Sequence, residues 1–291
     1  SMQVCVSEAL FWYDDWPRLL VFIELWREAH NAHFTLNLKS VSKTVRKLLD
    51  FYEEQGVLTT IPWPDLPTFP GVENANKDVF NLEASIVQND CMLRSDAEVV
   101  ALLDIDEFIY IRNNQSIIDF MRAKRDEFHD LGALSFSTVG MQMNLLDGSF
   151  EAIGRESILK NVMPKKVAFF PNRVKTVSTH FVWELLGEYK QYNVNVNDAV
   201  VVHMRQNFVN NDNRKEIKLP YFTDSFRTML LTRKREVFGD SPPHFSPRRV
   251  VKTVVACYQR MGREHPNRHS NIRNIPGECR EYVRDLEEWI E

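Results

Sequence analysis

A run of five apolar residues, Val99–Leu103, leads directly into two aspartates one residue apart, Asp104 and Asp106, and then into Glu107-Phe108. The run is short, partly β-branched and bounded by polar residues, which predicts a strand buried on both faces. Alternation along an extended chain places the side chains of Asp104 and Asp106 on one face and Glu107 on the other. We expect this strand end at the carboxyl edge of an open α/β sheet, where ligands of such sheets bind.

Two carboxylates this close together repel each other unless a proton or a cation lies between them. A divalent metal ion is the simplest such cation, and carboxylate oxygens suit magnesium or manganese. The alternative is a strand end followed by a capped turn, in which the acids are only solvated. The buried strand before Asp104 and the Glu-Phe pair after Asp106 leave both interpretations open.

The elements around this motif alternate between strand and helix. The first half is predicted to contain strands at 4–6, 33–38 and 57–61, separated by helices at 16–29 and 42–55, the second of which ends at Gly56. This order predicts right-handed parallel crossovers and a doubly wound sheet. Further helices are expected at 84–95, 117–128 and 226–235, and further strands at 133–136, 167–170 and 199–203. A Pro/Arg-rich hinge at 241–249 precedes a terminal helical segment.

Composition and cysteine usage narrow the class of protein. The net charge of −4 and the pI of about 6.1 argue against nucleic acid as a partner, and no apolar run is long enough to span a bilayer. Four cysteines are too few for a disulfide scaffold and none has zinc-finger spacing. Cys257 and Cys279 could form a bridge in a secreted protein, whereas Cys5 and Cys91 are expected in core strands. Asn114-Gln115-Ser116 is a glycosylation sequon.

Three other chemistries can be compared with the motif. Phosphatases and mutases with an aspartyl nucleophile also place Asp-x-Asp after a buried strand, but near the start of the domain and before a small hydroxyl residue; they remain an alternative. A serine hydrolase would need a Gly-x-Ser-x-Gly elbow, which is absent from the sequence. A dinucleotide dehydrogenase would need Gly-x-Gly-x-x-Gly after the first strand, where Ser7-Glu8-Ala9-Leu10 stands instead.

Several motifs taken together resemble glycosyltransferase family 92. They are Val4-Cys5-Val6, the acidic and aromatic loop 11–16, Phe22-Ile23-Glu24, the block 89–94 ahead of 103–109, and two later histidine positions at His180 and His203-Met204-Arg205. The second histidine motif is normally His-Tyr-Arg, so Met204 is a mild departure. The resemblance runs from about Val4 to Arg205, and the last 85 or so residues resemble no family that we can name.

The resemblance implies an α/β fold of the nucleotide-diphospho-sugar transferase type A (GT-A), with a mostly parallel doubly wound sheet, an acceptor-side region and a C-terminal helical extension. The transferase domain is expected over 1–240, with a nucleotide-sugar half at about 1–112, an acceptor half at about 113–240, and the extension at 241–291. The implied reaction is a Mn²⁺-dependent transfer (Mg²⁺ is possible) of a hexose, galactose, from a UDP-sugar to a glycan, with inversion. The implied location is the Golgi lumen, as the ectodomain of a type II membrane protein whose anchor precedes these residues; Ser1-Met2 is typical of an expression-tag remnant.

The resemblance also implies which residues contact the nucleotide sugar: Ser7, Asn37, Asn89, Arg94, Asp104, Ile105, Asp106 and Arg205. For the metal we expect Asp104, Asp106 and His203 as ligands, with His180 as the alternate. His203 is preferred because it ends the apolar strand 199–202 and would emerge at the same sheet edge as Asp106. An imidazole ligand favours manganese over magnesium.

The acceptor side is less determined by the sequence. An inverting transfer needs a carboxylate near the acceptor hydroxyl, and Glu151, Glu156 and Glu184 are equal candidates for this base. Trp63 and Trp183 could stack on sugar rings, although core packing is the commoner fate of tryptophan. A non-catalytic relative that binds a glycan or a partner is the other alternative. The intact pair of aspartates argues against it, because a fold without catalysis has no reason to keep two like charges together.

Overall fold

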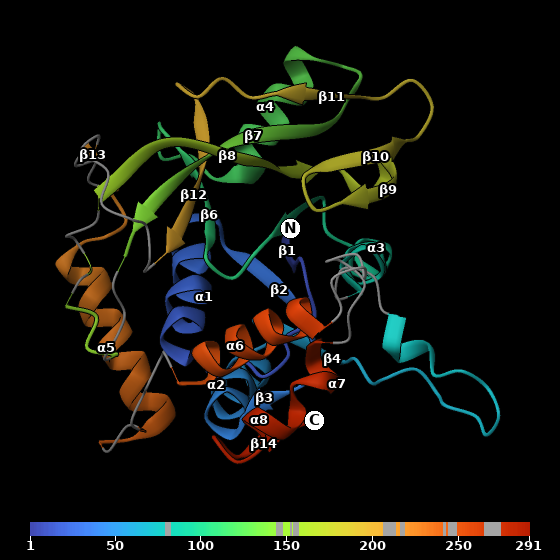
Figure 1. Cartoon of the computed structure of the whole chain (residues 1–291). Coiled ribbons are helices and arrows are strands. Elements are labelled where there is room, and N and C mark those ends of the chain that lie inside the picture. The colour runs from blue at the N-terminus through green and yellow to red at the C-terminus, as the bar shows by residue number, and fades with distance from the viewer. Residues whose placement is uncertain are drawn as a thin grey trace.

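The computed structural model describes residues 1–78, 83–143, 148–151, 153, 157–205, 214–215, 219–240, 243, 249–264 and 275–291. Its centre is a mixed ten-stranded sheet in which eight strands follow the order β4-β2-β1-β5-β8-β7-β12-β6 (Figure 1). β11 (Lys190–Asn193) adds to β7, and β13 (Arg214–Lys215) adds to β8. Short 3₁₀ helices span Ala75–Asp78 and Pro171–Arg173.

The first half of the chain builds the parallel part of the sheet. Its elements are β1 (Met2–Val6), α1 (Trp16–His30), β2 (Ala32–Leu38), α2 (Lys43–Glu54), β4 (Leu58–Pro62), α3 (Ala84–Arg94) and β5 (Val99–Leu103). β1 pairs in parallel with both β2 and β5, and β2 pairs in parallel with β4. Asp15 and Ser42 cap α1 and α2 by accepting hydrogen bonds from backbone N–H groups of the first turn. The predicted parallel crossovers are therefore present in this half.

The second half pairs mainly in the antiparallel sense. It contains β6 (Glu107–Ile111), α4 (Ile117–Glu127), β7 (Leu131–Gln142), β8 (Ser157–Phe169), β12 (Ala199–Arg205) and α5 (Asp224–Phe238). β8 runs antiparallel to both β5 and β7, and β12 lies between β7, its parallel neighbour, and β6, its antiparallel neighbour. A separate hairpin is formed by β9 (Val174–Ser178) and β10 (Phe181–Leu185). The β12–β6 pairing matters most, because it brings residue 203 opposite residue 107.

Different elements cover the two faces of the sheet. The larger core packs α1, α2, α4 and α5 against side chains such as Val4, Phe34 and Leu103, and the smaller core packs α3 and the β9–β10 hairpin against Val100 and Leu102. A disulfide joins Cys5 of β1 to Cys91 within the smaller core. The expectation that both of these cysteines lie in strands was wrong for Cys91, which lies on α3.

The C-terminal segment packs back onto the first half of the domain (Figure 1). It comprises α6 (Arg249–Glu264), α7 (Ile275–Glu278), α8 (Arg280–Val283) and β14 (Trp289–Ile290), and β14 pairs with β3 (Val41–Ser42). The predicted bridge between Cys257 and Cys279 is present and joins α6 to the segment before α8. In the described part of the chain, no helix combines the length and apolar character needed to cross a bilayer.

Candidate functional site

The paired acids lie in a tight turn between β5 and β6, at the carboxyl edge of the parallel strands. The backbone N–H of Glu107 donates to the carbonyl of Asp104 at 3.0 Å, which closes the turn. The chain therefore does not stay extended through this motif, and strand alternation does not set the direction of its side chains. Glu107 does not point away from the aspartates as alternation predicted. Its carboxylate accepts a hydrogen bond from the backbone N–H of Asp104 at 2.9 Å.

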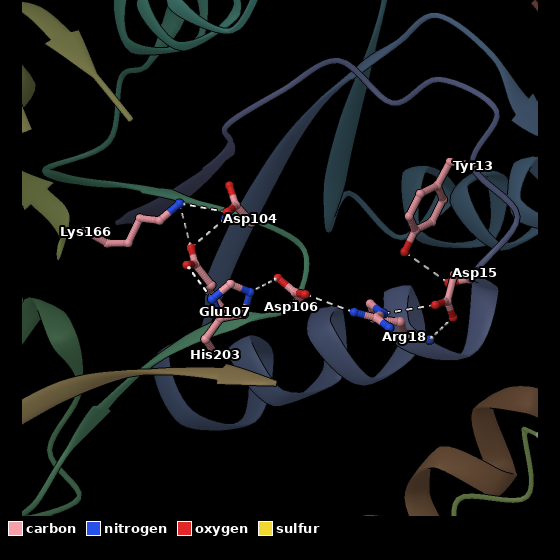
Figure 2. Close-up of polar contacts among 8 residues, drawn as sticks. All are labelled: Tyr13, Asp15, Arg18, Asp104, Asp106, Glu107, Lys166 and His203. Atoms are coloured by element: carbon pink, nitrogen blue, oxygen red, sulfur yellow. Dashed lines mark hydrogen bonds and ion pairs between the residues drawn. The ribbon is translucent and has the colours of Figure 1, made fainter. Parts of the chain in front are cut away.

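Lys166 of β8 lies between two of the three acids (Figure 2). Its Nζ is 2.8 Å from Asp104 Oδ2 and 3.0 Å from Glu107 Oε2, and its side chain is only 2% exposed. Burial and the Asp104 charge raise the pKa of Glu107 to about 7, even though Lys166 opposes this shift. Part of the charge repulsion in the turn is therefore relieved by a buried lysine.

Asp106 lies between His203 and Arg18 (Figure 2). Its Oδ1 is 3.0 Å from His203 Nε2, and its Oδ2 accepts a hydrogen bond from Arg18 Nη1 at 2.9 Å. The other ring nitrogen of His203 faces Glu107 Oε1 at 3.5 Å. His203 is buried and stands opposite Glu107 in the β12–β6 register, so strand pairing fixes the ring between the two carboxylates.

The first turn of α1 holds Arg18 in place. The cap residue Asp15 accepts from Arg18 Nε at 2.9 Å and from its backbone N–H at 3.1 Å. Tyr13 donates its hydroxyl to the carbonyl of Asp15 at 3.1 Å. Arg18 therefore connects the loop after β1 to the acid turn after β5.

A cavity of about 780 Å³ opens above these residues. Its polar wall contains Glu8, Asp14, Asp15, Arg18, Asp104 and Asp106, and its other lining residues come mainly from the loop 9–13 and from α6. Burial, followed by the charge of Asp15, raises the pKa of Asp14 to about 7, and burial together with Asp104 raises the pKa of Glu8. The volume lies within the range of small-molecule and cofactor sites.

The donor atoms of the site can be compared with what a divalent ion requires. Among the described residues, no three His, Cys, Asp or Glu side chains converge as a metal site. Asp106 Oδ1 and His203 Nε2 are in direct polar contact at 3.0 Å, and two ligands at about 2.1 Å from one ion and at right angles would be about as far apart. An ion bound together with a nucleotide takes its remaining ligands from phosphates and water. Asp106 and His203 therefore fit an ion that is held jointly with a diphosphate.

A known protein family matches most of the chain. The model of the family described as glycosyltransferase family 92 matches residues 1–238. The chain belongs to glycosyltransferase family 92. It is 23% identical over 189 residues to the Caenorhabditis elegans family 92 protein F13G3.3, covering 61% of this chain and 37% of that protein. For the C. elegans family 92 protein C33H5.2 the identity is 22% over 283 residues, covering 88% and 53%. The chain thus spans about half or less of the length of these relatives.

Solved structures with a partial likeness to this family 92 chain include TarS and LgtC. S. aureus TarS 1–349 in complex with UDP-GlcNAc has a TM-score of 0.40 at 10% identity, covering 93% of this chain and 74% of that one. The galactosyltransferase LgtC in complex with donor and acceptor sugar analogues has a TM-score of 0.31 at 14% identity, covering 59% and 58%. The predicted family is confirmed by the match over residues 1–238, and the predicted α/β class is confirmed by the mixed central sheet and its covering helices.

Most of the donor-site residues predicted for this family 92 chain lie together. Asp104, Ile105 and Asp106 line the cavity, and the backbone N–H of Ser7 bonds the carbonyl of Leu103 at 2.9 Å. Asn37 lies at the end of β2, where its carbonyl accepts from the N–H of Leu10. The Ser7 hydroxyl and both polar side-chain atoms of Asn37 are buried without a hydrogen-bond partner among the described residues.

Two other residues predicted to bind the nucleotide sugar do not join this group. The side-chain amide of Asn89 donates to the carbonyl of Val177 and accepts from its backbone N–H, each at 3.0 Å. These two hydrogen bonds join α3 to β9. Arg94 is exposed at the C-terminal end of α3, where it pairs with Asp90. That end of α3 lies near the amino ends of β1 and β5, because Ser95 bonds Gln3 and Glu98 bonds Ser1. In this structure neither side chain contacts the acid turn, because Asn89 is engaged with β9 and α3 continues from there toward the amino ends of β1 and β5.

The two histidines have different places in the family 92 fold. His203 contacts Asp106, whereas His180 is exposed at the tip of the β9–β10 hairpin, with Nδ1 2.9 Å from the carbonyl of Lys165. Partial burial and the nearby Lys166 lower the pKa of His180. Arg205 continues β12 and pairs through its backbone with Gln142; its side chain lies outside the described residues.

The proposed bases and the sequon are dispersed. Glu184 is exposed on β10 and paired with Lys175 at 2.7 Å. Glu156 falls outside the described residues. Glu151 is exposed directly after Phe150, whose ring is 6.3 Å from that of Trp16 at the start of α1. Asn114 is exposed in the turn before α4, in the left-handed conformation with φ 59°.

Three residues of the site were not predicted from the sequence. Arg18, Lys166 and Glu8 contribute to the cavity or to the acid network, but none belongs to a short motif. The one available cue for Lys166 is its position directly before the apolar run Val167–Phe170. That cue does not distinguish buried Lys166 from exposed Lys165.

Proposed function

We propose that this family 92 domain transfers a hexose from a UDP-sugar to a glycan acceptor with inversion, using a divalent ion, preferentially Mn²⁺ and otherwise Mg²⁺. The identity of the hexose as galactose rests on family resemblance alone. The observation that carries the donor-binding part is the contact of 3.0 Å between His203 and Asp106, an aspartate that lines the 780 Å³ cavity.

The charges around the acid turn suit the breaking of a sugar–phosphate bond. When that bond breaks, negative charge accumulates on the departing diphosphate, and a divalent ion held by Asp106 and His203 would neutralise it. Glu107 faces the second ring nitrogen of His203 and so orients the imidazole, the arrangement that commonly supports a metal-bound histidine. Lys166 holds Asp104 and Glu107 in place, so the turn is preorganised before the donor binds.

Orphaned polar atoms near the cavity support a nucleotide ligand. A buried polar group without a hydrogen bond costs about 1–3 kcal/mol, so the fold alone does not favour keeping one. Ser7 and Asn37 each carry such groups within the described part of the chain, next to Glu8 and Leu10, which line the cavity. We assign these groups to hydrogen bonds with the nucleoside of the donor.

An acceptor surface is suggested by exposed aromatic rings. Trp183 on β10 is 71% exposed, and its ring centroid is 5.0 Å from that of Phe181. The tip of the same hairpin lies near the site, because Gln88 bonds both Thr179 and the carbonyl of Ser7. We assign this aromatic pair to the acceptor glycan. Glu151 is retained as the base candidate, because its neighbour Phe150 packs beside the start of α1.

The proposed location is the Golgi lumen, on a membrane anchor outside these residues. Two disulfides and an exposed sequon at Asn114 support passage through the secretory route.

The test of donor binding is calorimetry of UDP with and without MnCl₂. We expect binding to require the divalent ion, and Asp106→Asn to weaken it by about 10- to 100-fold, as is typical of a perturbed metal site. Asp90→Asn is the matched control, because Asp90 pairs with Arg94 at the other edge of the sheet. Unchanged Mn²⁺-dependent affinity in Asp106→Asn would contradict the assignment.

Turnover separates an enzyme from a glycan-binding relative. Release of UDP from a panel of UDP-sugars, measured with a glycan acceptor array, should be fastest with UDP-galactose. A different preferred sugar would refute the donor identity alone. Metal-dependent UDP binding without release from any donor would favour the non-catalytic alternative.

A further inference from the structure

The C-terminal helix α6 forms one wall of the cavity that contains the acid turn. Val250, Val251, Lys252, Val254 and Val255 all line this cavity, together with residues of the loop after β1. These residues lie beyond residue 238, where the match to family 92 ends. The cavity is therefore built partly by a segment that the family assignment does not cover.

Several contacts hold α6 in this position. Val250 is buried in a small cluster with Trp12 and Val283, and the Trp12 and Trp289 rings lie 5.2 Å apart. β14 pairs with β3, and the Cys257–Cys279 disulfide ties the far end of α6 to the same C-terminal segment. The wall is thus fixed to the first half of the domain by packing, strand pairing and a covalent bond.

The cavity lining combines two kinds of chemistry. On α6, Val251 and Val255 are 52% and 46% exposed although both are apolar, and Leu10 and Phe11 line the cavity as well. The charged part of the described lining consists of five carboxylates, Arg18 and Lys252. A ligand with a flat, weakly polar ring joined to a diphosphate that carries a divalent ion would match both, because the ion meets the carboxylates.

The two basic residues Arg18 and Lys252 differ in how far their charges are already paired with carboxylates. Arg18 is already bonded to both Asp15 and Asp106. Lys252 is exposed and makes no ion pair with any of the described residues. Of the two basic side chains among the described lining residues, Lys252 is therefore the one whose charge is available to a ligand.

We propose that α6 is part of the donor site: Val251 and Val255 cover the nucleobase, and Lys252 binds the diphosphate. This inference rests on the proposed use of a UDP-sugar. It adds that the segment beyond the family match contributes both contact surface and charge to donor binding.

The experiment compares UDP with uridine on the disulfide-bonded chain in the presence of Mn²⁺. Lys252→Glu should weaken UDP binding by about 10- to 100-fold, the loss expected when a charge-assisted contact is removed, and should leave uridine binding unchanged because uridine has no phosphate. Val255→Asp should weaken binding of both ligands. Arg249→Glu and Ala256→Asp are matched controls on α6, since neither residue lines the cavity, and both should bind UDP as the unmodified chain does.

The outcomes distinguish this inference from the function on which it rests. If the unmodified chain binds UDP and Lys252→Glu matches Arg249→Glu, the role of α6 is refuted and the proposed function stands. If the unmodified chain does not bind UDP, both are refuted. Equal loss of UDP and uridine binding in Lys252→Glu would refute the assignment of Lys252 to the diphosphate. Thermal unfolding of each variant shows whether it is folded.

Discussion

Replacing Lys166 by methionine should destabilise the domain in a pH-dependent way. Nζ of Lys166 is 2.8 Å from Asp104 and 3.0 Å from Glu107. At an effective dielectric constant of about 20, each contact is worth roughly 6 kcal/mol of attraction. Desolvation of the buried ammonium and carboxylates offsets much of this sum. Breaking a buried ion pair from one side typically costs about 3–5 kcal/mol, and we expect a loss in this range at pH 8.

The pH dependence follows from Glu107, whose pKa is raised to about 7 with Lys166 in place. Without the lysine this pKa rises further, so the variant keeps its proton on Glu107 between pH 6 and 8, whereas the unmodified chain releases it. Stability falls with pH wherever the folded state binds more protons than the unfolded state. One additional bound proton over about one pH unit corresponds to about 1.4 kcal/mol. The loss of unfolding free energy caused by Lys166→Met should therefore be about 1.4 kcal/mol smaller at pH 6 than at pH 8.

Urea unfolding followed by tryptophan fluorescence at both pH values measures this difference. Lys165→Met is the control, because Lys165 is the exposed neighbour of Lys166, and we expect it to change stability by less than about 0.5 kcal/mol. Adding Glu107→Gln to Lys166→Met should restore roughly 2 kcal/mol at pH 8, because the neutral amide removes the free-energy cost of keeping Glu107 protonated at a pH well above the pKa that it has in the unfolded chain. Equal stability of the two lysine variants at pH 8, or a loss that does not change with pH, would refute the reasoning.

Three further expectations concern other parts of the molecule. Replacing Cys5 and Cys91 together by alanine should cost about 4 kcal/mol in thermal unfolding, because the disulfide closes a separation of 86 residues. The unmodified chain should lose roughly 2 kcal/mol of unfolding free energy between pH 5 and 8, because the pKa of Asp14, raised to about 7, favours the protonated folded state. Asp14→Asn should not show this loss, and an unchanged pH profile of its unfolding free energy would contradict the prediction. Trp183→Ala should raise KM for the glycan acceptor without changing UDP affinity, because Trp183 is exposed beside Phe181.

The first half of the fold could be predicted because its signals are local. Apolar spacing, the Ser42 cap and the Gly56 stop define α2 within about one turn, and the apolar run 99–103 defines β5. Such patterns depend on neighbours within a few residues. The strands of the second half pair with distant partners, so β8, with 13 residues, extended well beyond the four that its apolar pattern indicated.

The site was predicted only where the chain continues a local pattern. Asp104 and Asp106 follow β5 directly, and His203 lies near the end of β12, so the positions of these three residues could be expected. Glu107 could not, because the turn that redirects it is closed by a hydrogen bond that no periodicity predicts. Lys166 could not, because the register of β8 against β5 and β7 decides which of two adjacent lysines is buried.

The cations that face the acid turn change how a paired-acid motif should be interpreted. From the sequence, two neighbouring carboxylates require a cation, and a metal is the simplest one. In the folded chain Arg18 and Lys166 reach the turn from α1 and β8, so much of the repulsion is balanced by the protein itself. The motif alone therefore does not require a metal in the resting state. The requirement would arise when a diphosphate binds, because Arg18 and Lys166 are already paired and the added negative charge needs a further cation. Metal affinity measured without nucleotide should accordingly be weaker than metal affinity measured with UDP, and equal affinities in the two titrations would show that the ion belongs to the turn itself.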